Sequence, residues 1–189
     1  MRQLSKAYAK DCLPLNANNG SASLSTFPLW STQAQRQELF WGYSPDVRLA
    51  QIAQRMNKPI LALETSGEQI KALTPSSQAE FDQAFDATLN AFESGKMQTE
   101  LAQLHKSWQQ NDWPAIVKLE QEMSASQPAF TARLVDQRNL LMVQKIDALH
   151  QEGKRVFVAV GALHMAGKAA LPKLLQDRGY AVTQVPLRN

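Results

Sequence analysis

The stretch RVFVAVGALHMAGKAALPKLLQDRGYAV, residues 155–182, decides the predicted fold. An apolar run at 155–161 is followed by a short turn, a leucine-rich segment at 168–179 and another apolar run at 180–186. These pieces predict a strand, a helix that ends at Gly179 and a second strand. Two strands joined by one helix form a βαβ unit, and such units are parallel and right-handed in nearly all proteins. We therefore expect a βαβ unit at this end of the chain.

His164 follows the first of these strands by one short turn. Ligands of open α/β sheets bind beyond the C-terminal ends of the strands, which is where His164 is expected. We interpret Gly161 as a sharp turn that aims the His164 side chain into that crevice. An imidazole there can bind a metal, move a proton or polarise an oxyanion. The alternative is a loop histidine hydrogen-bonded to a backbone carbonyl.

The segment GALHMAGK also has some similarity to a phosphate-binding loop. That loop needs four residues between its first glycine and the Gly-Lys pair, followed by Ser or Thr. Here five residues separate Gly161 from Gly167, and Ala169 follows Lys168. The nucleotide-binding interpretation is therefore excluded, and the weaker alternative is an anion held by the amides at the start of the helix near Lys168.

A second apolar run, KPILALE at 58–64, is typical of a strand covered on both faces. It ends in Glu64, and a helix start follows, with Ser66 and Gln69 spaced as a capping box and Thr65 and Glu68 as the alternative. If this strand neighbours the 155–161 strand in parallel, Glu64 and His164 emerge at the same sheet edge, as a metal-ligand pair or an acid and base couple. A strand-end glutamate that only caps a helix is the alternative. Two groups are fewer than the three protein ligands of a catalytic zinc, so the chain holds half a site.

The remaining signals predict helices. The segment after Ser44 and Pro45 places apolar residues on one face, a capping box begins another helix at Ser77, and Asp112 with Pro114 separates two more. The expected inward residues are Leu49, Ile52, Ala53 and Met56 in the first helix, and Phe81, Phe85, Leu89 and Phe92 in the second.

A long helix over 130–150 carries Leu134, Leu141 and Ile146 as inward candidates. Arg138 shares their face, and a charge on an apolar face needs a partner or a route to solvent.

These elements predict a helix-rich α/β fold, with a short mixed or parallel sheet, a C-terminal βαβ unit and a large helical middle insertion. At 189 residues, 44% apolar and 20% charged, the chain fits one domain over 1–189, with 14–28 as an exposed loop. No run is long enough to span a membrane, and the net charge of +3 is spread without a basic stripe for nucleic acid. The N-terminus lacks a secretory signal, which favours a cytoplasmic location. Cys12, His105 and His150 are given no role.

The segment 156–182 closely resembles the C-terminal signature of the TraB/GumN family, whose relatives include the Tiki proteases and, more remotely, erythromycin-esterase-like and ChaN-like proteins. Two upstream segments are similar to further family features: SPDVRLAQIAQRMNKPILALETSGEQIKAL at 44–73 to its helix, strand and Leu-Glu-Thr segment, and LVDQRNLLMVQKI at 134–146 to its Arg-Asn helix. The pieces stand in the family's order over roughly 44–185.

The resemblance implies a metal-dependent hydrolase or protease-like site, built from two Gly-x-x-His motifs, a pair of glutamates and an arginine. By matching position, Gly161 and His164 are the second Gly-x-x-His motif, Glu64 is an acidic site residue and Arg138 is the arginine. His164 and Glu64 are the implied metal ligands, and Zn, Mn or Co is the implied divalent ion. The substrate is open, with peptide as one class.

The sequence departs from the family at its N-terminal end. No histidine precedes His105, so the first Gly-x-x-His motif and the acidic strand after it have no counterpart. The chain is then either a fragment of an exported enzyme or a short member that has lost the metal site, and it is expected to be inactive alone. Missing strands would expose a sheet edge, which predicts a homodimer or a swapped assembly. A non-catalytic helical binding or regulatory module is the second interpretation.

Overall fold

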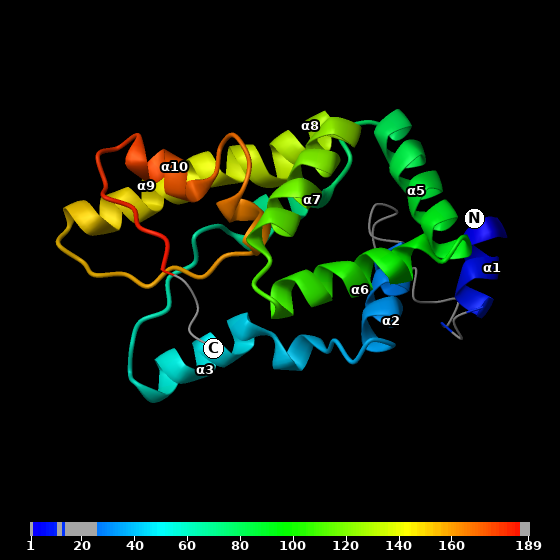
Figure 1. The fold of residues 1–189 in the computed structure, drawn as a ribbon, viewed down its shortest axis with the longest axis horizontal. Coiled ribbons are helices and arrows are strands. Elements are labelled where there is room, and N and C mark those ends of the chain that lie inside the picture. The colour runs from blue at the N-terminus through cyan, green and yellow to red at the C-terminus, as the bar shows by residue number, and fades with distance from the viewer. Residues whose placement is uncertain (1, 11–12, 14–25, 186–189) are drawn as a thin grey trace. The chain divides into compact units, whose positions relative to one another are not determined.

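A computed structural model describes residues 2–10, 13 and 26–185, and helices are the regular structure in this part of the chain (Figure 1). The helices in the N-terminal half are α1 (Arg2–Lys10), α2 (Phe27–Gln35), η3 (Trp41–Tyr43), α3 (Pro45–Arg55), α4 (Ser66–Leu73), α5 (Gln78–Glu93) and α6 (Lys96–Gln109). Those in the C-terminal half are α7 (Trp113–Ser126), α8 (Pro128–Thr131), the π-helical turn η4 (Ala132–Asp136), α9 (Gln137–Gln151), the 3₁₀ turn η5 (Ala162–Met165) and α10 (Leu171–Gln176).

The chain divides into two compact units. The first unit is drawn from residues 1–60 and 74–106, and the second from residues 61–73 and 107–189. The prediction of one domain over 1–189 stays a prediction. Most of the loop predicted over 14–28 lies outside the described residues, while Phe27 and Pro28 open helix α2.

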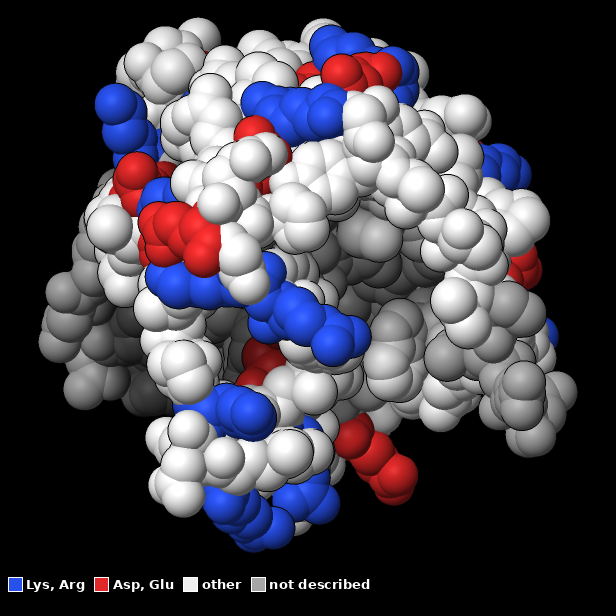
Figure 2. All heavy atoms as spheres, turned by 90° about the vertical axis from the view of Figure 1, so that its left-hand side faces the viewer, with Lys and Arg blue, Asp and Glu red and all other residues white. Residues whose placement is uncertain are grey.

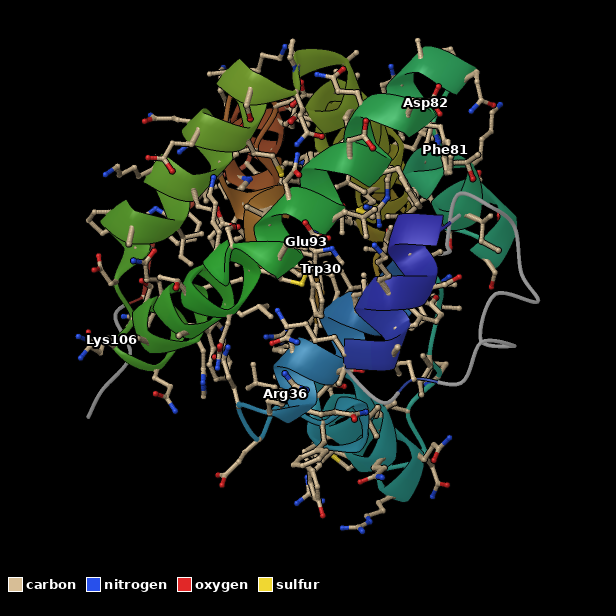
Figure 3. All side chains as sticks on the ribbon, turned by 90° about the vertical axis from the view of Figure 1, so that its right-hand side faces the viewer. Trp30, Arg36, Phe81, Asp82, Glu93 and Lys106 are labelled. Atoms are coloured by element: carbon tan, nitrogen blue, oxygen red, sulfur yellow. The ribbon has the colours of Figure 1, made fainter. Side chains whose placement is uncertain are left out.

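The core of the first unit joins α1, α2, α5 and the start of α6. Its buried residues are Leu4, Ala7, Tyr8, Leu29, Leu89, Phe92 and Met97. Trp30, labelled in Figure 3, packs against this core from α2. Leu89 and Phe92 are buried, and Phe85 packs beside them, so this part of the predicted stripe on α5 is confirmed as core.

The core of the second unit lies between α9 and α10, which run side by side (Figure 1). Met142, Val143, Ile146 and Leu171 are buried there. Leu63, Val158, Val160, Leu174 and Leu175 are partly buried against them. The helix pair and two of the apolar runs therefore form one cluster.

The α/β prediction is wrong for the described residues, because none of them forms a β-strand. The runs 58–64, 155–161 and 180–185 are irregular, and among the described residues no backbone hydrogen bond joins one of these runs to another. Burial still alternates along one of them, since Val158 and Val160 face the core while Phe157 is 81% exposed. Period-two patterning fits a strand, but a strand also needs a ladder partner. None of the three described runs pairs with another, so the predicted sheet and βαβ unit do not form.

Helix boundaries agree better with the sequence. The Ser44 hydroxyl accepts a hydrogen bond from the Val47 N–H, and Pro45 opens α3. The Ser77 hydroxyl and the Asp112 carboxylate cap α5 and α7 in the same way. Gly179, with φ +87°, lies just past α10, where helices favour a glycine.

Two expectations about helix faces are wrong. Helix α3 has no buried residue, and Ile52 and Met56 on its predicted inward face are 50% and 61% exposed. Residues 130–150 are helical throughout, as α8, the π-helical turn η4 and α9, but Leu141 on the predicted inward face is 49% exposed, although Ile146 is buried.

Candidate functional site

His164 lies in the short turn η5, between the extended run 155–161 and α10. Its backbone N–H donates to the Gly161 carbonyl over 3.0 Å, which closes the turn and points the side chain inward. The residue is only 7% exposed. The ring Nδ1 lies 2.5 Å from Oδ1 of Asn139 on α9.

Asn139 has no solvent exposure and binds both ends of the segment that carries His164. Its Nδ2 donates to the carbonyl of His164 over 3.0 Å and to the carbonyl of Ala169 over 2.8 Å. Asn139 has no role among the site residues predicted from the sequence. A signal was present, because Asn139, Met142, Val143 and Ile146 recur at helical spacing and Asn139 is the polar member of that buried face.

The other ring nitrogen of His164, Nε2, has no hydrogen-bond partner within residues 2–10, 13 and 26–185. Burial lowers the pKa of His164 from its ordinary value of 6.5, and the positive charge of Arg138 lowers it further, while Glu64 opposes the shift. Burial and Arg138 thus both favour the neutral form of the imidazole. The unpartnered nitrogen of a neutral imidazole can accept a proton or bind a metal ion.

Arg138 and Glu64 form a two-bonded ion pair. Arg138 Nε donates to Glu64 Oε2 over 2.8 Å, and Arg138 Nη2 donates to Glu64 Oε1 over 2.5 Å. Nη1 of Arg138 donates to the Leu134 carbonyl, one turn earlier, over 2.8 Å. The two side chains are only 13% and 18% exposed. Arg138 thus has the partner that a cation on an apolar helix face requires.

The three sequence-predicted site residues all lie in the second unit. They are not brought together by a sheet edge, as expected, but by α9. Arg138 holds the segment that ends in Glu64, and the next residue, Asn139, holds the turn that carries His164. No direct hydrogen bond joins His164 to Glu64 among the bonds of the described residues.

The donor set does not fit the implied divalent metal. Both oxygens of Glu64 are engaged by Arg138, and Oε1 also accepts from Gln69 Nε2 over 3.3 Å. In the part of the chain that the structure describes, no group of three or more His, Cys, Asp or Glu residues could hold a metal ion. Of the two predicted ligands for Zn, Mn or Co, only His164 has a free donor atom, Nε2. A catalytic zinc needs three protein ligands.

The glycine that shapes this loop is Gly167, not Gly161. Gly161 has φ −60°, which any residue adopts, and an added Cβ would lie an ordinary 3.8 Å from Cδ2 of His164. Gly167 has φ +86°, and an added Cβ would lie 2.6 Å from Oε1 of Glu120. Our interpretation of Gly161 as a forced turn is wrong, and the tight position falls three residues after His164.

Glu120 on α7 was not identified from the sequence. It is 4% exposed, and its carboxylate lies against Gly167. No described residue gives it a hydrogen bond or an ion pair. A buried carboxylate without a partner is uncommon in proteins, because desolvation disfavours the charge.

Helix α4 begins with the capping box of Thr65 and Glu68, the alternative to Ser66 and Gln69. The Thr65 N–H donates to Glu68 Oε2 over 2.6 Å, and the Glu68 N–H donates to the Thr65 hydroxyl over 3.2 Å. This box fixes the chain direction immediately after Glu64. Glu64 itself does not cap the helix, which leaves its carboxylate for Arg138.

The remaining candidates have ordinary surroundings. Lys168, beside the rejected phosphate loop, pairs with Asp136 over 3.2 Å. His150 stacks on Tyr180 with ring centroids 5.1 Å apart, and His105 is partly buried in α6. Cys12 lies outside the described residues.

Charge on the surface is mixed. On the face shown in Figure 2, Lys and Arg side chains lie beside Asp and Glu side chains, in keeping with the absence of a basic run in the sequence. No helix within the described ranges has the length and apolar character that a membrane span requires. The expected homodimer was to form through a sheet edge; the described residues provide no such edge, and the oligomeric state stays a prediction.

Comparison with known proteins supports the resemblance seen in the sequence. The chain is 33% identical over 159 residues to the uncharacterized protein YbaP of Escherichia coli (strain K12), and the match covers 80% of this chain and 58% of that relative. YbaP of Shigella flexneri matches with the same identity and coverage. The chain thus spans little more than half the length of these relatives. No solved structure matches it.

The model of the TraB/PrgY/gumN family matches residues 1–184, which is nearly the whole sequence. This match includes the Gly161–His164 turn, the Glu64 segment and the Arg138–Asn139 pair. The chain belongs to the TraB/PrgY/gumN family.

Proposed function

We propose that this chain carries part of a hydrolase centre in which Nε2 of His164 is the reacting atom. The observation that carries the proposal is the position of this side chain: it is buried and held at Nδ1 by Asn139, with Nε2 unpartnered among the described residues. An imidazole in that state accepts a proton from water or from a substrate hydroxyl at Nε2, as a general base does.

The ion pair beside it supports this role. The positive charge of Arg138 lowers the pKa of His164, which keeps the Nε2 lone pair free near neutral pH. Arg138 has five N–H groups in its guanidinium. Its three bonds to Glu64 and Leu134 engage one N–H on each of its three nitrogens, so one N–H remains on each terminal nitrogen. These donors suit the oxyanion that develops when an acyl group is attacked.

The family resemblance suggests peptide as the substrate class, and we include peptide as part of this proposal. A metal is not needed for the proton transfer described above. The divalent ion remains a separate prediction with His164 as its one available donor, and a further polypeptide segment would have to supply the other ligands.

The second candidate function is a non-catalytic binding module that keeps the family fold. One observation favours it: both oxygens of Glu64 are bound to Arg138, so the acid that the resemblance places in the site is not free. A module of this kind binds its ligand at the same turn but does not cleave it.

The two candidates are separated by incubating the protein with a peptide mixture and following cleavage by mass spectrometry. The hydrolase predicts cleavage that is lost in His164→Ala and kept in His105→Ala, which removes a histidine outside the site. Binding without cleavage, lost in His164→Ala, supports the module. Cleavage that survives His164→Ala would overturn the role of this histidine.

The metal prediction has its own test. Melting temperatures are measured with Zn, Mn and Co, because an ion that binds only the folded state raises apparent stability. A rise that is absent in His164→Ala supports a metal at Nε2. No rise in the wild-type protein contradicts it for this chain.

A further inference from the structure

Asn139 is the residue on which the state of His164 depends. It lies in α9 with no solvent exposure, and its amide contacts both the His164 ring and the His164 backbone. We propose that Asn139 is the positioning residue of this site: it sets the tautomer of His164 and closes the 164–169 loop. This inference rests on the proposed function only for its effect on catalysis.

The orientation of the Asn139 amide follows from its neighbours. Two carbonyl oxygens, of His164 and Ala169, lie 3.0 and 2.8 Å from one end of the amide. Carbonyl oxygens only accept, so that end is the NH₂ group, which supplies two donors. The opposite orientation would place Oδ1 against two acceptors.

The tautomer of His164 follows from that orientation. Oδ1 of Asn139 must face the ring nitrogen at 2.5 Å, and an amide oxygen only accepts. Nδ1 of His164 therefore carries the proton. In a neutral imidazole that holds its proton on Nδ1, the lone pair is on Nε2. Histidine in water favours the other tautomer, with the proton on Nε2, so Asn139 reverses the ordinary preference.

The same amide also fixes the loop. By holding the carbonyls of His164 and Ala169 together, Asn139 bridges the two ends of a segment that includes the tight position Gly167. Both functions need two donors and one acceptor on a short side chain. Aspartate keeps the acceptor but lacks the donors, and leucine keeps the shape but lacks both.

The tautomer is measured by ¹⁵N NMR of the imidazole of His164 in the full chain. We expect protonated Nδ1 and unprotonated Nε2 in the wild-type protein, and a shift of the population toward protonated Nε2 in Asn139→Leu. Asn139→Asp should retain a protonated Nδ1 while losing the bonds to the loop carbonyls. Gln144→Leu, an exposed change on the same helix, is the control and should leave the tautomer unchanged.

A wild-type ring that carries its proton on Nε2 would overturn the inference, whatever the variants do. If Asn139→Leu does not fold, the wild-type spectrum and Asn139→Asp still decide it. Where peptide cleavage is observed, Asn139→Leu should lower kcat by about 10–100-fold, the usual effect of losing a partner that orients a histidine. Absence of cleavage with the expected tautomer defeats the proposed function and leaves the positioning role intact.

Discussion

Arg138 and Asn139 are consecutive on α9, and their side chains hold two segments that are far apart in the sequence. Arg138 binds Glu64, 74 residues away, and Asn139 binds His164, 25 residues away. The turn η4, which directly precedes α9, is a π-helical turn, and turns of this kind occur frequently at functional sites. One helix start thus organises the site.

The ion pair between Arg138 and Glu64 makes the first prediction. Glu64→Gln leaves a largely buried guanidinium without its charged partner, and we expect the free energy of unfolding to fall by roughly 1.5–3 kcal/mol, the usual range for a hydrogen bond to a charged group. Urea denaturation measures the change.

The double variant Glu64→Leu, Arg138→Met removes both charges together. Replacing a buried pair by apolar residues is often neutral, so the double variant should lose less than the sum of the two single variants. Strictly additive losses would show that the two side chains act independently.

Local signals in the sequence predicted several of the helix boundaries. A cap such as Ser44, Ser77 or Asp112 acts within one turn of the chain, and so does Gly179 past α10. The same locality explains why Thr65 with Glu68 was available only as an alternative to Ser66 with Gln69, since both pairs have the capping spacing.

The sheet could not be predicted from these signals, because strand formation depends on a second segment. Residues 155–161 have strand-like composition, and Val158 and Val160 do face a core, but that core is helix α9. Glu64 and His164 were therefore expected near each other for the wrong reason. The spacing along α9 places Asn139 on the buried face, but its role with His164 is recognised only from its contacts.

The pKa of His164 makes the second prediction. Burial lowers the pKa in the folded state, so the unfolded state binds more protons as pH falls below the ordinary value of 6.5. Stability should therefore decrease as pH falls through 6.5 toward the lower folded pKa. Above pH 6.5 the stability that comes from the neutral His164 is fully present. The melting temperature is measured from about pH 7.5 to about pH 5, a range that includes the free histidine pKa. Its change with pH gives the slope of stability against pH.

His164→Gln should flatten that slope. The carboxyl groups of Glu68 and Asp147 do not interfere, because hydrogen bonds from the Thr65 backbone and the Tyr180 hydroxyl lower their pKa values from 4.5 and 3.8. An unchanged slope in His164→Gln would contradict the buried neutral histidine.

The two glycines of the His164 loop make the third prediction. Gly167→Ala should cost about 1–2 kcal/mol, roughly the penalty for a side chain in the left-handed region, and the Glu120 carboxylate would have to move away from the new Cβ. Gly161→Ala is the matched change at ordinary φ and should stay within about 0.5 kcal/mol of the wild type. Equal losses at the two positions would remove the distinction between them.

Glu120 makes the last prediction. The residue is only 4% exposed, and its carboxylate has no hydrogen-bond or ion-pair partner in the ranges that the structure describes. Glu120→Gln keeps the shape and removes the charge, and we expect the free energy of unfolding to rise by about 1 kcal/mol or more. The control is Glu122→Gln on the same helix, where an exposed pair with Lys118 at 3.7 Å should be worth less than about 1 kcal/mol. A loss of stability in Glu120→Gln would mean that the carboxylate binds a cation or donor in solution, and adding Mg, Ca or Zn during the melt would then identify an ion.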